Sequence, residues 1–137
     1  MSMRKCLAAG AFLVMLALQL TACKQQPTEF KSIQQQRSGD YVVVLLNDTG
    51  VLKQHAEHLR LEFRNASTNE LANVSNVQIE TTMKMPGMGP MFGNISSLRQ
   101  DSRGRYDFDA DFPMAGQWNF LVTFQPNGRV QFNASAQ

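Results

Sequence analysis

A two-residue hydrophobic period begins near Asp40, continues to the C-terminus, and constrains the fold of this chain more than any other feature. Successive side chains of a β-strand point to opposite faces of the sheet, so this period marks strands that bury one face. Residues 58–64 show it most clearly, because Leu59, Leu61 and Phe63 alternate with charged residues. No long segment after Asp40 carries the 3.6-residue period of an amphipathic helix. The chain is therefore expected to be all-β.

Five segments follow the pattern, a sixth at residues 41–46 is a continuous apolar run, and turn residues separate them. The segments are residues 41–46, 58–64, 77–85, 106–112, 118–124 and 130–132. Asn47-Asp48-Thr49-Gly50 and Pro126-Asn127-Gly128 are typical turn sequences, and the second predicts a hairpin. Six to seven short strands with polar outer faces predict an antiparallel β-sandwich of the immunoglobulin-like kind.

The first residues have the order of an export signal. Arg4 and Lys5 form a short positive region, and an apolar run extends from Leu7 to Leu18. The following Leu20-Thr21-Ala22-Cys23 resembles the lipobox of bacterial lipoproteins, whose cysteine is acylated when the signal is cleaved. A transmembrane helix is the alternative, but it needs about 20 apolar residues. We expect residues 1–22 to be removed and Cys23 to become the lipidated first residue.

Processing of this kind would leave the folded part of the chain without a thiol, because Cys6 lies in the signal and Cys23 carries the lipid. Disulfides, cysteine-ligated zinc, iron–sulfur clusters and cysteine nucleophiles are then excluded. The 13 basic residues fall to 11 without Arg4 and Lys5, while all 11 acidic residues remain, so the formal net charge becomes zero. A neutral domain gives no electrostatic reason to expect a nucleic-acid partner.

The 115 residues left when 22 of 137 are removed suffice for one hydrophobic core, and residues 40–137 are expected to form that single domain. Residues 23–39 are expected to be the lipidated cysteine and a flexible tether. The stretch contains five glutamines, and Phe30 and Ile33 are its only sizeable apolar residues. A coil of this length reaches roughly 20–24 Å. Lys24 directly follows the lipobox, which resembles the default for the periplasmic face of the outer membrane.

Two histidines and a row of aspartates are the candidates for harder metal ions. His55 and His58 would point to opposite faces of one strand, so a shared metal would need a bend between them; otherwise they are surface side chains. Asp107, Asp109 and Asp111 invite a calcium interpretation, but no glycine-bearing turn lies among them. We expect these aspartates to form the solvated face of a strand. No acid–base pair or nucleophile stands out, so a non-enzymatic protein is expected.

The methionines are the unusual feature of the domain. Four of the five that follow the signal fall within nine residues, at Met83, Met85, Met88 and Met91, and the fifth, Met114, lies in a predicted turn. Thioethers are soft, neutral donors that favour Cu(I) and bind zinc, calcium or magnesium poorly. Met83 and Met85 would project from one side of a strand end, about 6–7 Å apart. The Pro/Gly loop after them could fold Met88 or Met91 back to complete a three-sulfur site.

Two interpretations without metal stay open. Met83 and Met85 have core parity, and methionine fills gaps in hydrophobic cores. Met88 and Met91 could instead cap an open end of the sandwich or form an adaptable surface for a protein partner.

Several motifs together resemble the YtkA-like domain family over roughly residues 40–134. They are Met-x-Met-Pro-Gly-Met-Gly from Met83, Gly104-Arg105-Tyr106, Phe112-Pro113-Met114-Ala115-Gly116-Gln117-Trp118, and Gly50-Val51-Leu52-Lys53 before Leu59-Arg60-Leu61. The resemblance implies a small immunoglobulin-like sandwich. Similar domains occur as exported lipoproteins and in periplasmic adaptors of heavy-metal efflux systems, and a related family accompanies copper supply to terminal oxidases. His55 stands where the pattern has glycine, which adds a metal ligand or alters a turn.

The sequence thus predicts a lipid-anchored periplasmic protein that binds Cu(I) through the four clustered methionines. Met114, His55 and His58 are expected to supplement the site. The role would be sequestration, or transfer to an efflux or oxidase-assembly partner. The alternative is a metal-free interaction module that uses the Met/Pro/Gly loop as its docking surface.

Overall fold

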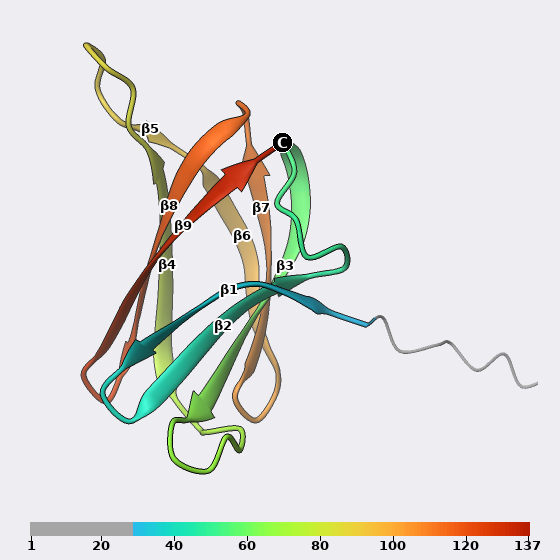
Figure 1. Ribbon diagram of the computed structural model, residues 1–137, viewed down its shortest axis with the longest axis vertical. Helices are drawn as coiled ribbons and strands as arrows, with labels where there is room; N and C mark the ends of the chain where they lie inside the picture. Colours follow the sequence, from blue (N-terminus) through green and yellow to red (C-terminus); the bar gives the residue numbers. More distant parts are fainter. Residues whose placement is uncertain (1–28) are drawn as a thin grey trace, which may run out of the picture.

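The computed structural model describes residues 29–137, and within them nine β-strands and no helix are present (Figure 1). No membrane-spanning helix occurs in that part of the chain. Cys23 and the predicted signal lie outside the described residues. The strands are β1 (Lys31–Ser38), β2 (Tyr41–Asn47), β3 (His55–Asn65), β4 (Ser75–Met83), β5 (Met91–Phe92), β6 (Asn94–Ser102), β7 (Arg105–Phe112), β8 (Gly116–Gln125) and β9 (Gly128–Ala136).

The strands form two antiparallel sheets that face each other across one core. One sheet has the order β1-β2-β3-β7-β6 and the other the order β5-β4-β8-β9. The run β2-β3-β7-β6 reproduces the A-B-E-D sheet of an immunoglobulin domain, and β4-β8-β9 reproduces its C-F-G sheet. The predicted immunoglobulin-like antiparallel sandwich is therefore confirmed, with β1 and β5 added at the edges.

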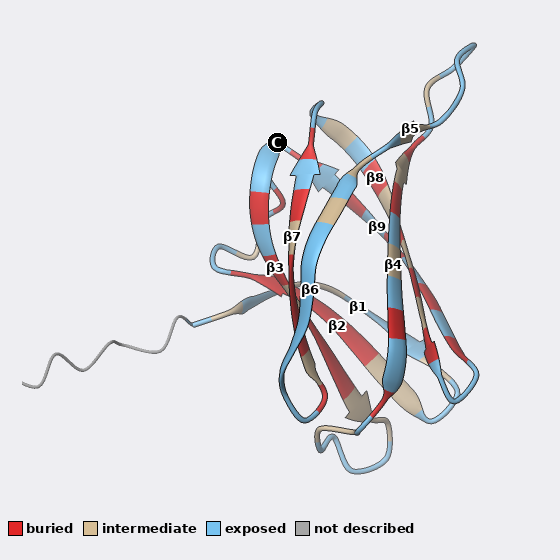
Figure 2. Ribbon diagram, turned by 180° about the vertical axis from the view of Figure 1, so that it is seen from behind, coloured by how far each residue is buried: buried red, intermediate tan, exposed pale blue. Residues whose placement is uncertain are grey.

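Aromatic side chains fill the space between the sheets, as expected for a sandwich without a disulfide. Trp118 is fully buried, and its ring centroid lies 5.2 Å from that of Phe112. Phe120 packs against the same phenylalanine at 5.6 Å. Aromatic rings bury large areas and gain further energy from tilted contacts of this kind. In Figure 2 buried and exposed residues accordingly alternate along β9, as expected for a strand that buries one face.

The sequence predicted six to seven strands, and it did not predict β1, β5 and β6 among the nine observed. β5 has only two residues, whereas β1 and β6 are edge strands without a buried side chain (Figure 2). The prediction of a flexible tether was wrong for Lys31–Ser38, because β1 pairs with β2 along its length. Edge strands are held mainly by backbone hydrogen bonds, so their side chains need not alternate between apolar and polar.

Tyr106, at the start of β7, ties the core to the loop before β4. Its hydroxyl donates a hydrogen bond of 2.7 Å to the backbone carbonyl of Val74, and both groups are buried. Burial raises the pKa of the Tyr106 phenol, so the donor stays protonated. The hydrogen bond therefore leaves no buried polar group unpaired at this place.

Replacement of Tyr106 by phenylalanine should lower the free energy of unfolding by about 1–2 kcal/mol, because the buried carbonyl of Val74 loses its donor. Urea denaturation of the chain from Lys24 onward measures the change. Tyr41→Phe is the matched control, since the structure describes no hydrogen bond from that hydroxyl within residues 29–137. Equal destabilisation by the two variants would contradict a specific role for the Tyr106 hydroxyl.

Candidate functional site

The methionine cluster lies on the β4–β5 hairpin, which projects from one end of the sandwich (Figure 1). Met83 is the last residue of β4 and pairs directly with Met91, the first residue of β5. Directly opposed residues of antiparallel strands share one face and have Cβ atoms about 4.5–5.5 Å apart. The loop therefore folds Met91 back onto Met83, which is one of the two arrangements that the sequence allowed.

The hairpin loop is built from residues that favour a tight reversal of the chain. Gly87 has a φ of 74°, in the left-handed region, and Pro86 and Pro90 flank the turn. The backbone N–H of Met88 donates to the carbonyl of Met85 over 3.2 Å. Met88 consequently lies at the tip with 69% of its surface exposed. Unlike the other three methionines, it is not packed against the core.

Burial divides the cluster into an inner and an outer part. Met83 is only 6% exposed and belongs to the hydrophobic core. Met85 and Met91 are half-buried and pack against that core. These three thioethers therefore contribute to packing, as the gap-filling interpretation expects. Met88 has no such role, so packing accounts for only part of the cluster.

The β7–β8 turn brings Met114 to the same end of the sandwich. A side chain on Gly116 would lie 2.9 Å from the Cε atom of Met83, so the turn lies directly over that thioether. The backbone carbonyl of Met114 accepts a 2.9 Å hydrogen bond from the indole Nε1 of Trp118. The buried tryptophan thus fixes the turn, while the Met114 side chain stays 40% exposed.

His55 also lies at this end, where it opens β3 opposite Phe112, the last residue of β7. The neighbouring Gln54 side chain donates to the carbonyl of Pro113 over 3.0 Å, which ties the approach to β3 to the β7–β8 turn. His55 is exposed and has a φ of 73°, a conformation that suits the glycine of the family pattern better than histidine.

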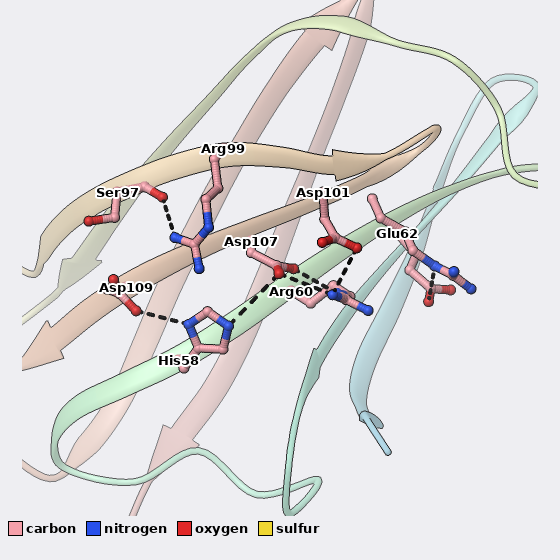
Figure 3. A network of polar contacts seen from close by, with 9 residues as sticks. His58, Arg60, Glu62, Ser97, Arg99, Asp101, Asp107 and Asp109 are labelled. Atoms are coloured by element: carbon pink, nitrogen blue, oxygen red, sulfur yellow. Dashed lines mark hydrogen bonds and ion pairs between the residues drawn. The ribbon is translucent and has the colours of Figure 1, made fainter. Parts of the chain in front are cut away.

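His58 lies elsewhere, on the outer face of the five-stranded sheet (Figure 3). It is three residues, or about 10 Å, further along β3 than His55. Its Nδ1 is 2.9 Å from a carboxylate oxygen of Asp109, and its Nε2 is 3.9 Å from one of Asp107. The hydrogen bond with His58 lowers the pKa of Asp109. His58 is therefore engaged on both sides and does not join the methionines.

The aspartate row is not uniformly solvated, which corrects the prediction for one of its members. Asp107 is only 6% exposed, and its two carboxylate oxygens lie 2.6 and 3.0 Å from Nε and Nη2 of Arg60. Asp109 is half-buried, and Asp111 is exposed. Within residues 29–137 no three His, Cys, Asp or Glu side chains are grouped so that they could hold a metal ion. The row instead supplies Asp109 as a partner for His58 and Asp107 as a partner for Arg60, both on β3.

The buried acid Glu57 was not recognised in the sequence. Glu57 accepts hydrogen bonds from the backbone N–H of Lys53 at 3.1 Å and from the Asn47 amide at 3.4 Å. It thereby fixes the loop between β2 and β3, beside an open pocket that Phe30 also lines. The available signal was its parity, because Glu57 shares a strand face with the buried Leu59.

The model of the YtkA-like family matches residues 35–123, more than half of the chain. The chain belongs to the YtkA-like family. The matched region contains the methionine hairpin and the β7–β8 turn, so the features of the candidate site lie inside the YtkA-like domain. The match begins within β1, upstream of the predicted start of the sandwich. No curated protein matches the chain.

Gly93 sets the position of the hairpin in this YtkA-like domain, because there the chain passes from β5 in one sheet to β6 in the other. Its N–H donates to the carbonyl of Thr81 over 3.0 Å. A Cβ atom on Gly93 would collide with the Thr81 hydroxyl, which is buried and has no hydrogen-bond partner within residues 29–137. Only glycine allows this close approach of the two segments.

Gly93→Ala should destabilise the fold by about 1–3 kcal/mol, because the buried Thr81 must move and the pairing of β4 with β5 weakens. Urea denaturation measures the stability, and the methyl resonance of Met91 reports on the pairing. Gly89→Ala is the control within the same hairpin, since open space surrounds that position. The role assigned to Gly93 is wrong if both variants behave like the parent.

Proposed function

We propose that this YtkA-like protein is a non-enzymatic lipoprotein of the bacterial envelope that binds Cu(I) through Met83, Met85, Met88 and Met91. Its role is to sequester the ion, or to transfer it to an efflux or oxidase-assembly partner. One observation carries the proposal: the direct pairing of Met83 with Met91 in a hairpin that also holds the other two thioethers. Met114 and His55 lie at the same end of the sandwich and can supplement the site.

The chemistry of the donors favours a soft, monovalent ion. Thioether sulfur is neutral and polarisable, so it binds Cu(I) without the charge that a divalent ion demands from its ligands. Residues 24–137 contain no cysteine that could compete for the ion. Lys84 is the only charged residue between Met83 and Met91, so no carboxylate is available there for a harder metal.

The inner and outer parts of the cluster suit capture and release. The half-buried Met91 and the buried Met83 are held by the core, which reduces the entropy lost when they bind an ion together. Met88 is free at the tip and can meet an incoming ion or a competing ligand first. A site that is partly preorganised and partly open exchanges its ion readily with a partner that carries similar ligands.

The polar network around His58 supports a non-enzymatic function. A general base needs a ring nitrogen that can reach a substrate proton. Nδ1 of His58 is occupied by Asp109, and Nε2 faces Asp107, which Arg60 already holds. This arrangement gives His58 a structural role on the sheet surface.

The copper proposal is tested by competition against a Cu(I) chelator under anaerobic conditions, with the chain from Lys24 onward. Replacement of the four clustered methionines by leucine should reduce the affinity at least about a hundredfold, because leucine has no donor atom. Leucine keeps the volume, so the fold should lose little stability, and urea denaturation checks this. Met88→Leu alone should cause a smaller loss. A quadruple variant that competes as well as the parent would refute the site.

A metal-free docking surface is the second candidate, and the exposure of the hairpin favours it. Phe92 is 62% exposed at the base of the hairpin and Met88 is 69% exposed at its tip, and exposed apolar side chains of this kind often mark protein contacts. This candidate predicts that Phe92→Ser abolishes capture of a partner while the parent binds no copper in the competition experiment. Copper binding that survives Phe92→Ser supports the first candidate.

The anchoring proposal has its own test. Cys23→Ala in the full-length chain should move the protein from the membrane fraction to the soluble periplasmic fraction, because no cysteine remains at the lipobox. Fractionation and immunoblotting measure the distribution. The purified variant should keep the stability of the parent and any copper binding. A variant that stays in the membrane fraction would show that the lipid is not its anchor.

A further inference from the structure

β1 is attached to the sandwich mainly by its backbone pairing with β2. None of its eight side chains is fully buried, and Ile33, its only sizeable apolar residue, is half-buried against the core at a break in the register with β2. Beyond the pairing with β2, two exposed contacts reach β9. The Ser38 hydroxyl accepts the N–H of Arg129 over 3.2 Å, and the Gln34 side chain accepts the N–H of Asn133 over 3.0 Å. Segments with little apolar burial open locally at low free energy.

The sandwich does not need β1 to be complete. The strands β2-β3-β7-β6 and β4-β8-β9 already form both sheets of an immunoglobulin-like domain, and the aromatic core lies entirely within them. β1 is an addition outside β2, which would otherwise be the edge strand. Its release would therefore uncover Ile33 but leave the aromatic core and the methionine hairpin in place.

A contact between Phe30 and Arg60 holds the N-terminal end of β1 against the sheet. The Phe30 ring lies under the guanidinium group of Arg60, with the Cζ atom 4.1 Å from the ring centroid. Arg60 is itself fixed by both oxygens of Asp107 and by Asp101 at 3.3 Å (Figure 3). The His58 ring is 6.1 Å from that of Phe30. The ion-paired arginine thus offers a rigid cationic surface to one aromatic side chain.

We propose that β1 is a detachable strand and that the contact between Phe30 and Arg60 is its latch. The consequence for function rests on the proposed lipid anchor at Cys23. With β1 docked, Phe30 is seven residue steps from Cys23, which span at most about 25 Å. With β1 released, Asp40 is seventeen residue steps from Cys23, which span at most about 60 Å. Docking of β1 therefore shortens the tether, and release of β1 lengthens it.

Release would also change which end of the domain faces away from the membrane. Figure 1 shows the docked chain entering at the side of the sandwich. Tyr41 pairs with Asn65, at the end of β3 opposite to His55 and the methionine hairpin. Attachment through Tyr41 would direct the methionine hairpin away from the membrane. The docked state suits a partner close to the bilayer, and the released state suits one deeper in the periplasm.

Hydrogen exchange followed by mass spectrometry tests the detachable strand on the chain from Lys24 onward. Backbone amides of β1 should exchange at least about a hundredfold faster than those of the central strand β8, through an opening that leaves β8 protected. Phe30→Ala should accelerate exchange in β1 about tenfold and leave β8 unchanged. Phe92→Ala, which removes an exposed aromatic ring from β5, is the matched control and should change neither strand.

Two outcomes would overturn the proposal. Exchange of β1 and β8 at one common rate would show that β1 leaves only when the whole domain unfolds. Rapid exchange of β1 that Phe30→Ala does not alter would remove the latch. Neither outcome depends on lipid or copper, so both are distinguishable from failure of the anchoring or copper experiments.

Discussion

The contact between Trp118 and Phe112 is the interaction on which the rest of the structure depends. The two sheets have no disulfide between them, so the rings from β7 and β8 must hold them together. The same tryptophan donates to the carbonyl of Met114, so the core also fixes the turn that covers Met83. The geometry of the candidate site is therefore a consequence of aromatic packing several residues away.

The methionine hairpin extends the four-stranded sheet beyond this core, and two close approaches of the backbone determine where it lies. Gly93 passes against Thr81 where the chain changes sheets, and Gly116 passes over the end of Met83. Neither glycine carries chemistry of its own. Each makes room for a backbone segment that brings thioethers together, which is why a soft-metal site and core packing are compatible in one hairpin.

The outer face of the five-stranded sheet around Arg60 is held together by charged side chains rather than by apolar contacts. Arg60 forms ion pairs with Asp107 and Asp101 and contacts the Phe30 ring. The outer face of the five-stranded sheet thus provides a cationic contact for the residue that precedes β1. Because Asp107 is nearly excluded from solvent, its pairing with Arg60 is less screened than an exposed ion pair would be. The N-terminal segment is consequently ordered where its glutamine-rich sequence suggested a coil.

The sequence by itself determined the sandwich, because alternation in β3, β4, β7, β8 and β9 records which face of each strand is buried, and β2 is a continuous apolar run. It also determined the donor set, since the methionines and the absent thiols are facts of composition. It could not determine β1 and β6. These edge strands are held by backbone pairing with a neighbouring strand, and their own side chains show no pattern of burial. Only the tertiary structure separated His58 from the methionines, left Met88 exposed and buried Asp107. These outcomes depend on register and on contacts between residues far apart in the chain, which no local pattern encodes.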